Sequence, residues 1–204
     1  PQIVSGDKIA EKFDSFEMKN VTFTYPQSEK EDDENKKQEL EKLLAKPNMN
    51  KCNFTEFKIW ALENFLLGTG CRLSTALEVK VEDIDFQSKF ILFRHAKNRH
   101  QMYFPLSTSL ESVLKKYIAI RGIKGYLFPN SCGDRADKRT VQAQVKRYNN
   151  IRGVKRSGIH DFRRTFASNY IRAGGDVFRL QGLMGHKTLE QTRRYFKMYS
   201  DDLK

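Results

Sequence analysis

Several features that would assign the chain to a common protein class are missing from its sequence. A membrane-spanning helix needs about 20 consecutive apolar residues, and no hydrophobic run in the sequence is that long. The sequence also does not begin with a signal peptide. The three cysteines, Cys52, Cys71 and Cys132, have no CxxC spacing, which argues against a disulfide framework or a zinc site and indicates a reducing cytoplasm. No cluster of Asp and Glu accompanies the four histidines, so a metal-dependent nuclease is disfavoured and no cofactor is expected.

Positive charge, in contrast, is abundant and unevenly distributed. The 204 residues include 37 Lys and Arg and 25 Asp and Glu, a net charge of +12. Residues 1–50 carry 8 Lys and Arg against 11 Asp and Glu, a net charge of −3, which leaves 29 against 14, a net charge of +15, in residues 51–204. A body this basic suits a polyanionic partner, and nucleic acid is the first candidate. A merely basic soluble protein is the alternative.

The hydrophobic pattern predicts a mainly α fold with one small antiparallel β-sheet, an α+β class. Two or three strands are expected over residues 81–107, with turns at 87–89 and 96–100. Residues 1–27 lack a clear period and are interpreted as a linker, and the chain begins with Pro1 rather than Met, so we expect a piece of a longer protein. The expected helices are 28–45 (solvated, with an acidic start), 54–67 (ending at Gly68), 73–80, 107–122, 138–151, 158–175, 176–185 and 188–200.

Four basic side chains lie where they could bind an anion. His160 and Arg163 are three residues apart at a helix start and share one face. Arg72 follows a Gly-Thr-Gly break at the entrance to a helix, where backbone N–H groups and a guanidinium face the same space. Lys97 lies at the tip of the expected hairpin. Taken singly, each is better explained as a surface, capping or solubilising residue.

A phenol in a cationic setting is the least expected feature near the C-terminus. In GHKTLEQTRRYF (185–196), His186 lies at a turn, and Tyr195 follows nine residues later inside a helix, directly after two arginines. At about 100° per residue, Tyr195 falls at the edge of an apolar stripe that includes Leu189, Thr192 and Phe196. A packing residue is the simplest interpretation of a lone tyrosine there. A nucleophile that attacks an anion would also need such cationic neighbours.

In chain order these positions read Arg, Lys, His-x-x-Arg, His and Tyr, and the sequence resembles the catalytic domain of the tyrosine recombinase (phage integrase) family. The gap of nine between His186 and Tyr195 is familiar in that family. The resemblance runs from about residue 50 to the C-terminus and implies the tyrosine recombinase catalytic-domain fold. The matching blocks are GTGCRLSTALEVKVEDID (68–85), the lysine hairpin ending in YFPL (103–106), GIHDFRRTFASNYIRAGGD (158–176) and LMGHKTLEQTRRYF (183–196).

The resemblance implies a covalent reaction on DNA. Tyr195 would be the nucleophile, attacking a phosphodiester to give a 3′-phosphotyrosyl link and a free 5′-hydroxyl. Because the bond energy is conserved in this intermediate, neither ATP nor a metal is needed. Arg72 and Arg163 would clamp the non-bridging oxygens, whose growing charge fixed guanidinium donors stabilise.

The remaining roles follow from the same resemblance. Lys97 would be the general acid that protonates the leaving 5′-oxygen. His160 would act as general base toward the tyrosine or steady the phosphate, and His186 would hydrogen-bond a phosphate oxygen. Basic residues on the hairpin and on the helix 138–151 are the candidate DNA contacts, namely Lys97, Arg99, Lys138, Arg139, Lys146 and Arg147.

The sequence departs from the family pattern at two positions. Thr75 stands where an acidic residue is usual, which puts the orientation of Arg72 in doubt. Arg164 stands where a second histidine is common. Residues 28–204 are assigned to the catalytic domain, and residues 1–27 to the linker from a missing N-terminal DNA-binding domain.

The leading hypothesis is a site-specific recombinase or integrase, bacterial or phage-encoded and nucleoid-associated in the cytoplasm, that integrates or excises a mobile element. It would act as a homo-tetramer on two double-stranded DNA sites, with possible accessory directionality or DNA-bending proteins. One alternative keeps the chemistry but relaxes DNA as a type IB topoisomerase does; the HDFRRTF and GH-x8-Y blocks favour the recombinase. A second alternative is a DNA-binding regulator without catalysis, which the six filled positions disfavour.

Overall fold

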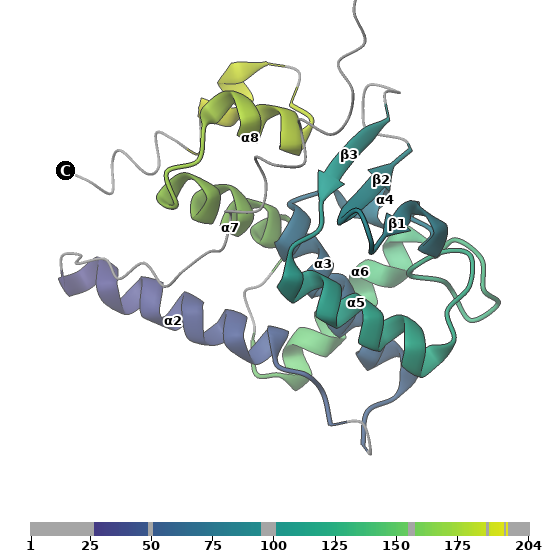
Figure 1. Cartoon of the computed structure of the whole chain (residues 1–204). Coiled ribbons are helices and arrows are strands. Elements are labelled where there is room, and N and C mark those ends of the chain that lie inside the picture. The colour runs from purple at the N-terminus through teal and green to yellow at the C-terminus, as the bar shows by residue number, and fades with distance from the viewer. Residues whose placement is uncertain are drawn as a thin grey trace, which may run out of the picture.

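The computed structural model describes residues 27–48, 51–94, 101–154, 158–186, 188–193 and 195. A small antiparallel sheet lies beside a mainly helical body, which confirms the predicted fold class (Figure 1). Residues 189–193 and 195 are also helical and are called the Tyr195 helix below. The elements in chain order are α2 (Gln27–Leu44), α3 (Phe54–Thr69), α4 (Leu73–Ala76), the 3-10 turn η1 (Val81–Asp83), β1 (Ile84–Asp85), β2 (Phe90–Phe93), β3 (Met102–Pro105), α5 (Thr108–Arg121), α6 (Lys138–Ile151), α7 (Ile159–Arg172) and α8 (Val177–Met184).

Helix α3 is the centre of the hydrophobic core. Its sequence is apolar on nearly every face, which is the pattern of a helix surrounded by protein. Helices α2, α5, α6 and α7 pack against it. Phe65 meets Phe93 of the sheet and Phe128 edge-on, with ring centroids 6.3 and 5.4 Å apart. The last turn of α3 is therefore held on several sides, and this fixed end is where the candidate site begins.

The helix was predicted over 54–67 with its stop at Gly68, and this boundary is wrong by two residues. Gly68 stays helical, and a Cβ added there would lie 3.1 Å from the Leu110 side chain of α5, so its small size serves helix packing. Gly70 ends the helix instead, with a left-handed backbone (φ 60°) and its N–H donated to the carbonyl of Leu66. The helix expected over 73–80 is likewise shorter, because Lys80 pairs with Tyr126 in an extended bridge.

The sheet has the order β1-β2-β3, and both pairs are antiparallel. Ile91 and Phe93 of β2 and Phe104 of β3 are buried on the core side. The turn predicted at 87–89 is present, with the carboxylate of Asp85 accepting from two backbone N–H groups. The turn predicted at 96–100, with Lys97 and Arg99, lies outside the described residues.

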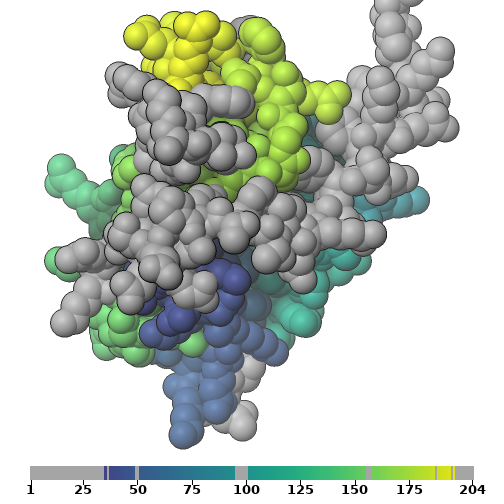
Figure 2. Space-filling view, turned by 90° about the vertical axis from the view of Figure 1, so that its left-hand side faces the viewer, coloured from purple at the N-terminus to yellow at the C-terminus, as the bar shows by residue number. Residues whose placement is uncertain are grey.

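Helix α2 was expected to be solvated, but its C-terminal end is docked on the core. Leu43 is buried, and the carbonyls of Leu43 and Leu44 accept from the Tyr148 hydroxyl (3.2 Å) and the Trp60 indole (2.8 Å). The start of α3 lies at one end of the molecule and the C-terminal helices lie at the other, in yellow-green (Figures 1 and 2). Within the described part of the chain, no helix combines the length and the apolar character that crossing a bilayer requires.

Candidate active site

Arg163 lies at the centre of the site and joins three elements. It belongs to α7, and only 7% of the residue is exposed. Its guanidinium donates one hydrogen bond to the carbonyl of Gly70 and another to the carbonyl of Met184, each 2.6 Å long. Both carbonyls lie at helix ends, where the backbone has acceptors without a partner in the helix. The planar guanidinium thus spans the ends of α3 and α8 and is held in one orientation.

The positive charge of Arg163 is not neutralised. Burial lowers the pKa of Arg163, and the charge of Arg72 lowers it further, while the Tyr195 phenol raises it. Among the described residues, no carboxylate forms an ion pair with Arg163. Cys71 is the other nearby acid, and burial raises its pKa to about 11, so it is a neutral thiol near pH 7. Because a buried cation without a counter-charge is unfavourable, the site is suited to receive an anion.

Arg72 lies beside Arg163. It is the residue before α4, half-buried, with an extended backbone and no capping hydrogen bond from its side chain. The charge of Arg72 lowers the pKa of Arg163, so the two guanidiniums lie near each other at the end of α3. Thr75, which stands where the family usually has an acid, is half-buried in α4.

His186 extends the cluster, and its protonation can be assigned from its partners. Its Nε2 lies 2.9 Å from the Arg163 guanidinium, and its Nδ1 lies 2.8 Å from the Thr192 hydroxyl. A guanidinium can only donate, so Nε2 must accept. The proton of the neutral imidazole is then on Nδ1, and that N–H donates to Thr192.

Tyr195 packs over this arrangement. Its ring stacks on His186, with centroids 6.1 Å apart and planes 6° apart. It also covers a small hydrophobic cluster formed by Ala167, Ile171, Leu180 and Met184. The phenol also raises the pKa of Arg163, so it lies near the guanidinium. The Tyr195 residue is therefore half-buried, with its polar end in the most cationic part of the site.

Four of the six residues proposed from the sequence are thus brought together, namely Arg72, Arg163, His186 and Tyr195. His160 lies in the first turn of α7 and is exposed. Lys97 lies outside the described residues. In the described ranges no three His, Cys, Asp or Glu side chains are grouped as a metal site would require.

Sequence reasoning missed Thr192 and the carbonyls of Gly70 and Met184. Thr192 was assigned to the apolar stripe, whereas its hydroxyl bonds His186. The available signal was its position three residues before Tyr195, on the same side of a helix. The carbonyls carry no residue-type signal, because every residue has one.

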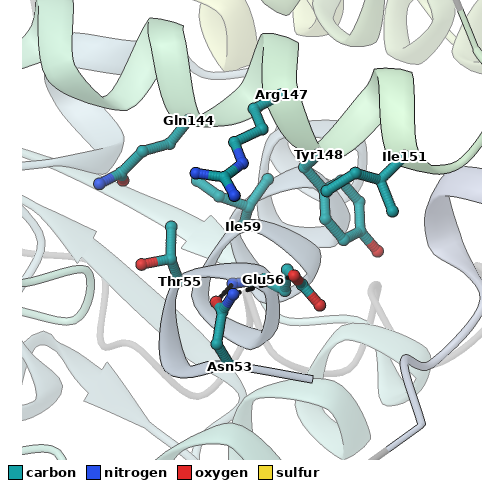
Figure 3. A pocket seen from close by; sticks show the side chains of 8 residues that line it. All are labelled: Asn53, Thr55, Glu56, Ile59, Gln144, Arg147, Tyr148 and Ile151. Atoms are coloured by element: carbon teal, nitrogen blue, oxygen red, sulfur yellow. Dashed lines mark hydrogen bonds between the residues drawn. The ribbon is translucent and has the colours of Figure 1, made fainter. Parts of the chain in front are cut away.

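The candidate DNA contacts on α6 are split between two faces. Arg139 and Lys146 are seven residues apart and share one face, and both are exposed. Arg147 is also exposed, but it is turned about 100° away from Lys146. It lines a cavity of about 170 Å³ with Glu56 and Thr55 at the start of α3 (Figure 3). Lys138 is the first residue of α6 and is exposed, and it lies on neither of these two faces.

Comparison with known proteins identifies the family of the chain. Residues 35–201 match the model of the phage integrase family. The chain belongs to this family. A probable integrase/recombinase of Acholeplasma phage L2 is 35% identical over 131 residues, which cover 64% of this chain and 45% of the relative. The tyrosine recombinase XerC of Thermodesulfovibrio yellowstonii is 32% identical over 165 residues, which cover 76% of this chain and 54% of the relative.

Solved structures confirm the predicted tyrosine recombinase catalytic-domain fold for this phage integrase family member. A XerA recombinase crystal structure superposes with a TM-score of 0.68 at 20% identity, covering 92% of this chain and 66% of that one. A XerH site-specific recombinase in a post-cleavage complex with palindromic difH substrate superposes with a TM-score of 0.67 at 26% identity, covering 81% of this chain and 50% of that one. The chain spans about half the length of the curated relatives it matches.

Proposed function

We propose that this chain carries the catalytic centre of a site-specific DNA recombinase or integrase that cuts and rejoins strands through a 3′-phosphotyrosyl intermediate. The observation that carries the proposal is the buried Arg163, which contacts His186 and Tyr195 and is not paired with a carboxylate in the described part of the chain. A phosphodiester is an anion that would neutralise this charge and bring its phosphorus atom to the phenol. Membership of the phage integrase family supports the same reaction.

The proposed step exchanges the bond from phosphorus to the 5′-oxygen of DNA for a bond from phosphorus to the Tyr195 oxygen. The Tyr195 oxygen attacks phosphorus as its proton passes to a base, for which His160 is the candidate. The bond from phosphorus to the 5′-oxygen breaks, and Lys97 gives that oxygen a proton. Arg72 and Arg163 stabilise the charge that grows on the non-bridging oxygens. Attack by a different 5′-hydroxyl reverses the step and completes strand exchange without ATP.

We propose integration or excision of a mobile element as the biological role, with a homo-tetramer acting on two DNA sites. A phage integrase/recombinase among the relatives supports the first part. A XerH relative in complex with palindromic DNA supports recognition of a specific double-stranded site. The tetramer follows from the family resemblance.

Covalent capture tests the proposal. The 204-residue chain is incubated with duplexes of randomised sequence. Each duplex is nicked so that cleavage releases a short fragment with the free 5′-hydroxyl, which diffuses away. Adducts are isolated on a denaturing gel, their DNA is sequenced, and the enriched duplex is retested with the wild-type chain and Tyr195→Phe. An adduct that Tyr195→Phe abolishes is the expected result.

Other outcomes would redirect the assignment. An adduct that survives Tyr195→Phe would move the nucleophile to another residue. Relaxation of any supercoiled plasmid, without an enriched sequence, would favour a type IB topoisomerase activity. Tight DNA binding without an adduct would favour a regulator that has lost catalysis.

A further inference from the structure

Thr192 is a polar side chain that is fully buried, with 0% exposure, inside the candidate site. It lies in the Tyr195 helix, three residues before Tyr195 and six after His186. A buried threonine in a helix usually bonds a backbone carbonyl of its own preceding turn. Here the hydroxyl lies 2.8 Å from Nδ1 of His186, which belongs to the turn before the helix.

The position of Thr192 completes a chain of contacts that runs through the site. The Thr192 hydroxyl meets one nitrogen of His186, and the Arg163 guanidinium meets the other at 2.9 Å. Arg163 in turn donates to the carbonyl of Gly70. The Tyr195 helix is therefore connected to the carbonyl of Gly70, at the end of α3, through the side chains of Thr192, His186 and Arg163.

We propose that Thr192 is a positioning residue for the proposed phosphotyrosyl reaction. By accepting the Nδ1–H of His186, it holds the imidazole in the tautomer whose Nε2 faces Arg163, and it anchors the Tyr195 helix to the arginine pair. This inference rests on the proposed function, because it concerns the orientation of the same four side chains.

The chemistry explains why an acceptor is needed at this position. In the structure Nε2 accepts from Arg163, so it has no proton for a phosphate oxygen. For His186 to donate to the scissile phosphate, Arg163 must release Nε2 and His186 must gain a proton there. The Nδ1–H is present before and after that change, and Thr192 accepts from it in both states. The ring can then change partners on one side while the other side stays fixed.

The first test measures the tautomer and needs no DNA. The chain is labelled with ¹⁵N-histidine, and the ring-nitrogen signals of the four histidines are recorded, with His186→Gln identifying those of His186. The wild-type chain and Thr192→Ser are expected to show the Nδ1–H form. Thr192→Val keeps the shape but removes the acceptor of the Nδ1–H. The ring is then expected to turn away from Arg163 in part of the molecules, which gives a mixture with the Nε2–H form. An Nε2–H form in the wild type, or an unchanged Nδ1–H form in Thr192→Val, would overturn the proposal.

The second test measures the adduct-forming rate with the duplex recovered by covalent capture. Thr192→Val is expected to slow it about 10- to 100-fold, the usual cost of removing a group that orients a reacting side chain, with DNA affinity unchanged. Thr192→Ser is expected to stay within about threefold of the wild type. Equal slowing by both variants would contradict the proposal. Failure of the wild type to form an adduct would instead count against the proposed function, and the tautomer result would still stand.

Discussion

At the residue scale, the contacts of Arg163 require the planar geometry of its guanidinium as well as its positive charge. Its guanidinium donates hydrogen bonds to the carbonyls of Gly70 and Met184 and to the imidazole of His186. An ammonium group keeps the charge but has no planar fork and cannot reproduce this set of contacts. Replacing Arg163 by lysine therefore tests the donor geometry while the positive charge is kept.

We expect Arg163→Lys to lower the adduct-forming rate about 100-fold or more, the range observed when one preorganised donor to a transition state is removed. The rate is measured in single turnover with saturating DNA. Arg164→Lys is the matched control, since Arg164 is exposed and its partner Asp161 lies 3.7 Å away; it is expected to change the rate less than threefold, as exposed ion pairs contribute little. A wild-type rate for Arg163→Lys would show that charge alone suffices.

At this scale the sequence predicted residue types but not their contacts. Arg72, Arg163, His186 and Tyr195 were found from their order and from the family resemblance, and they lie together. The acceptors of Arg163 could not be found, because they are backbone carbonyls brought near by the packing of α3, α7 and α8. The catalytic roles of all six residues, Lys97 and His160 included, remain predictions.

At the scale of elements, the contact between α3 and α7 depends on one glycine. Gly70 has φ of 60°, a left-handed conformation that side chains disfavour. A Cβ added there would lie 2.3 Å from the Phe166 ring of α7. The same residue supplies a carbonyl to Arg163, so the glycine serves both the packing and the site.

Gly70→Ala is expected to lower the free energy of unfolding by about 2–4 kcal/mol, from backbone strain and overpacking together. Gly122→Ala is the matched control, because Gly122 also ends a helix with φ of 57° but has nothing within 4 Å of an added Cβ. It should cost only about 1–2 kcal/mol. Chemical denaturation measures both, and equal losses would argue that Phe166 simply moves aside.

The elements themselves were largely predictable, since α5, α6 and α7 show helical periodicity and clear ends. The errors have tertiary causes. Helix α2 docks its end through Leu43, which lies in a mostly charged segment that gives little amphipathic signal. The helix expected over 73–80 stops at Ala76 because the following residues bridge to Tyr126.

At the scale of the whole molecule, one acidic group in the core should make stability depend on pH. Glu63 of α3 is fully buried, and burial raises its pKa well above the ordinary value, against the opposing effects of Arg152 and Asn149. Its oxygens accept no hydrogen bond of ordinary geometry from the described residues. The carboxyl group therefore holds its proton to a higher pH in the folded chain than in the unfolded chain.

The sign of the pH effect follows from proton binding. Above about pH 4.5 the unfolded chain has released this proton while the folded chain keeps it, so stability falls as the pH rises toward the folded pKa, by up to about 1.4 kcal/mol per pH unit. Glu63→Gln should remove this slope, and the exposed Glu41→Gln should leave it in place. Denaturation from pH 5 to 8 measures it, and parallel curves for the wild type and Glu63→Gln would contradict the assignment.

The net charge of +15 in residues 51–204 implies that DNA affinity falls steeply with salt, because each neutralised phosphate releases counterions.

The two faces of α6 make this prediction specific to single residues. Lys146→Ala should weaken binding to all sequences and reduce the slope of log affinity against log salt by about 1. Arg147 lines the cavity beside Glu56, so Arg147→Ala should leave the slope nearly unchanged (Figure 3). Binding isotherms at several salt concentrations measure both slopes; equal reductions would place Arg147 on the DNA as well, and a flat wild-type response would argue against a cationic DNA-binding face.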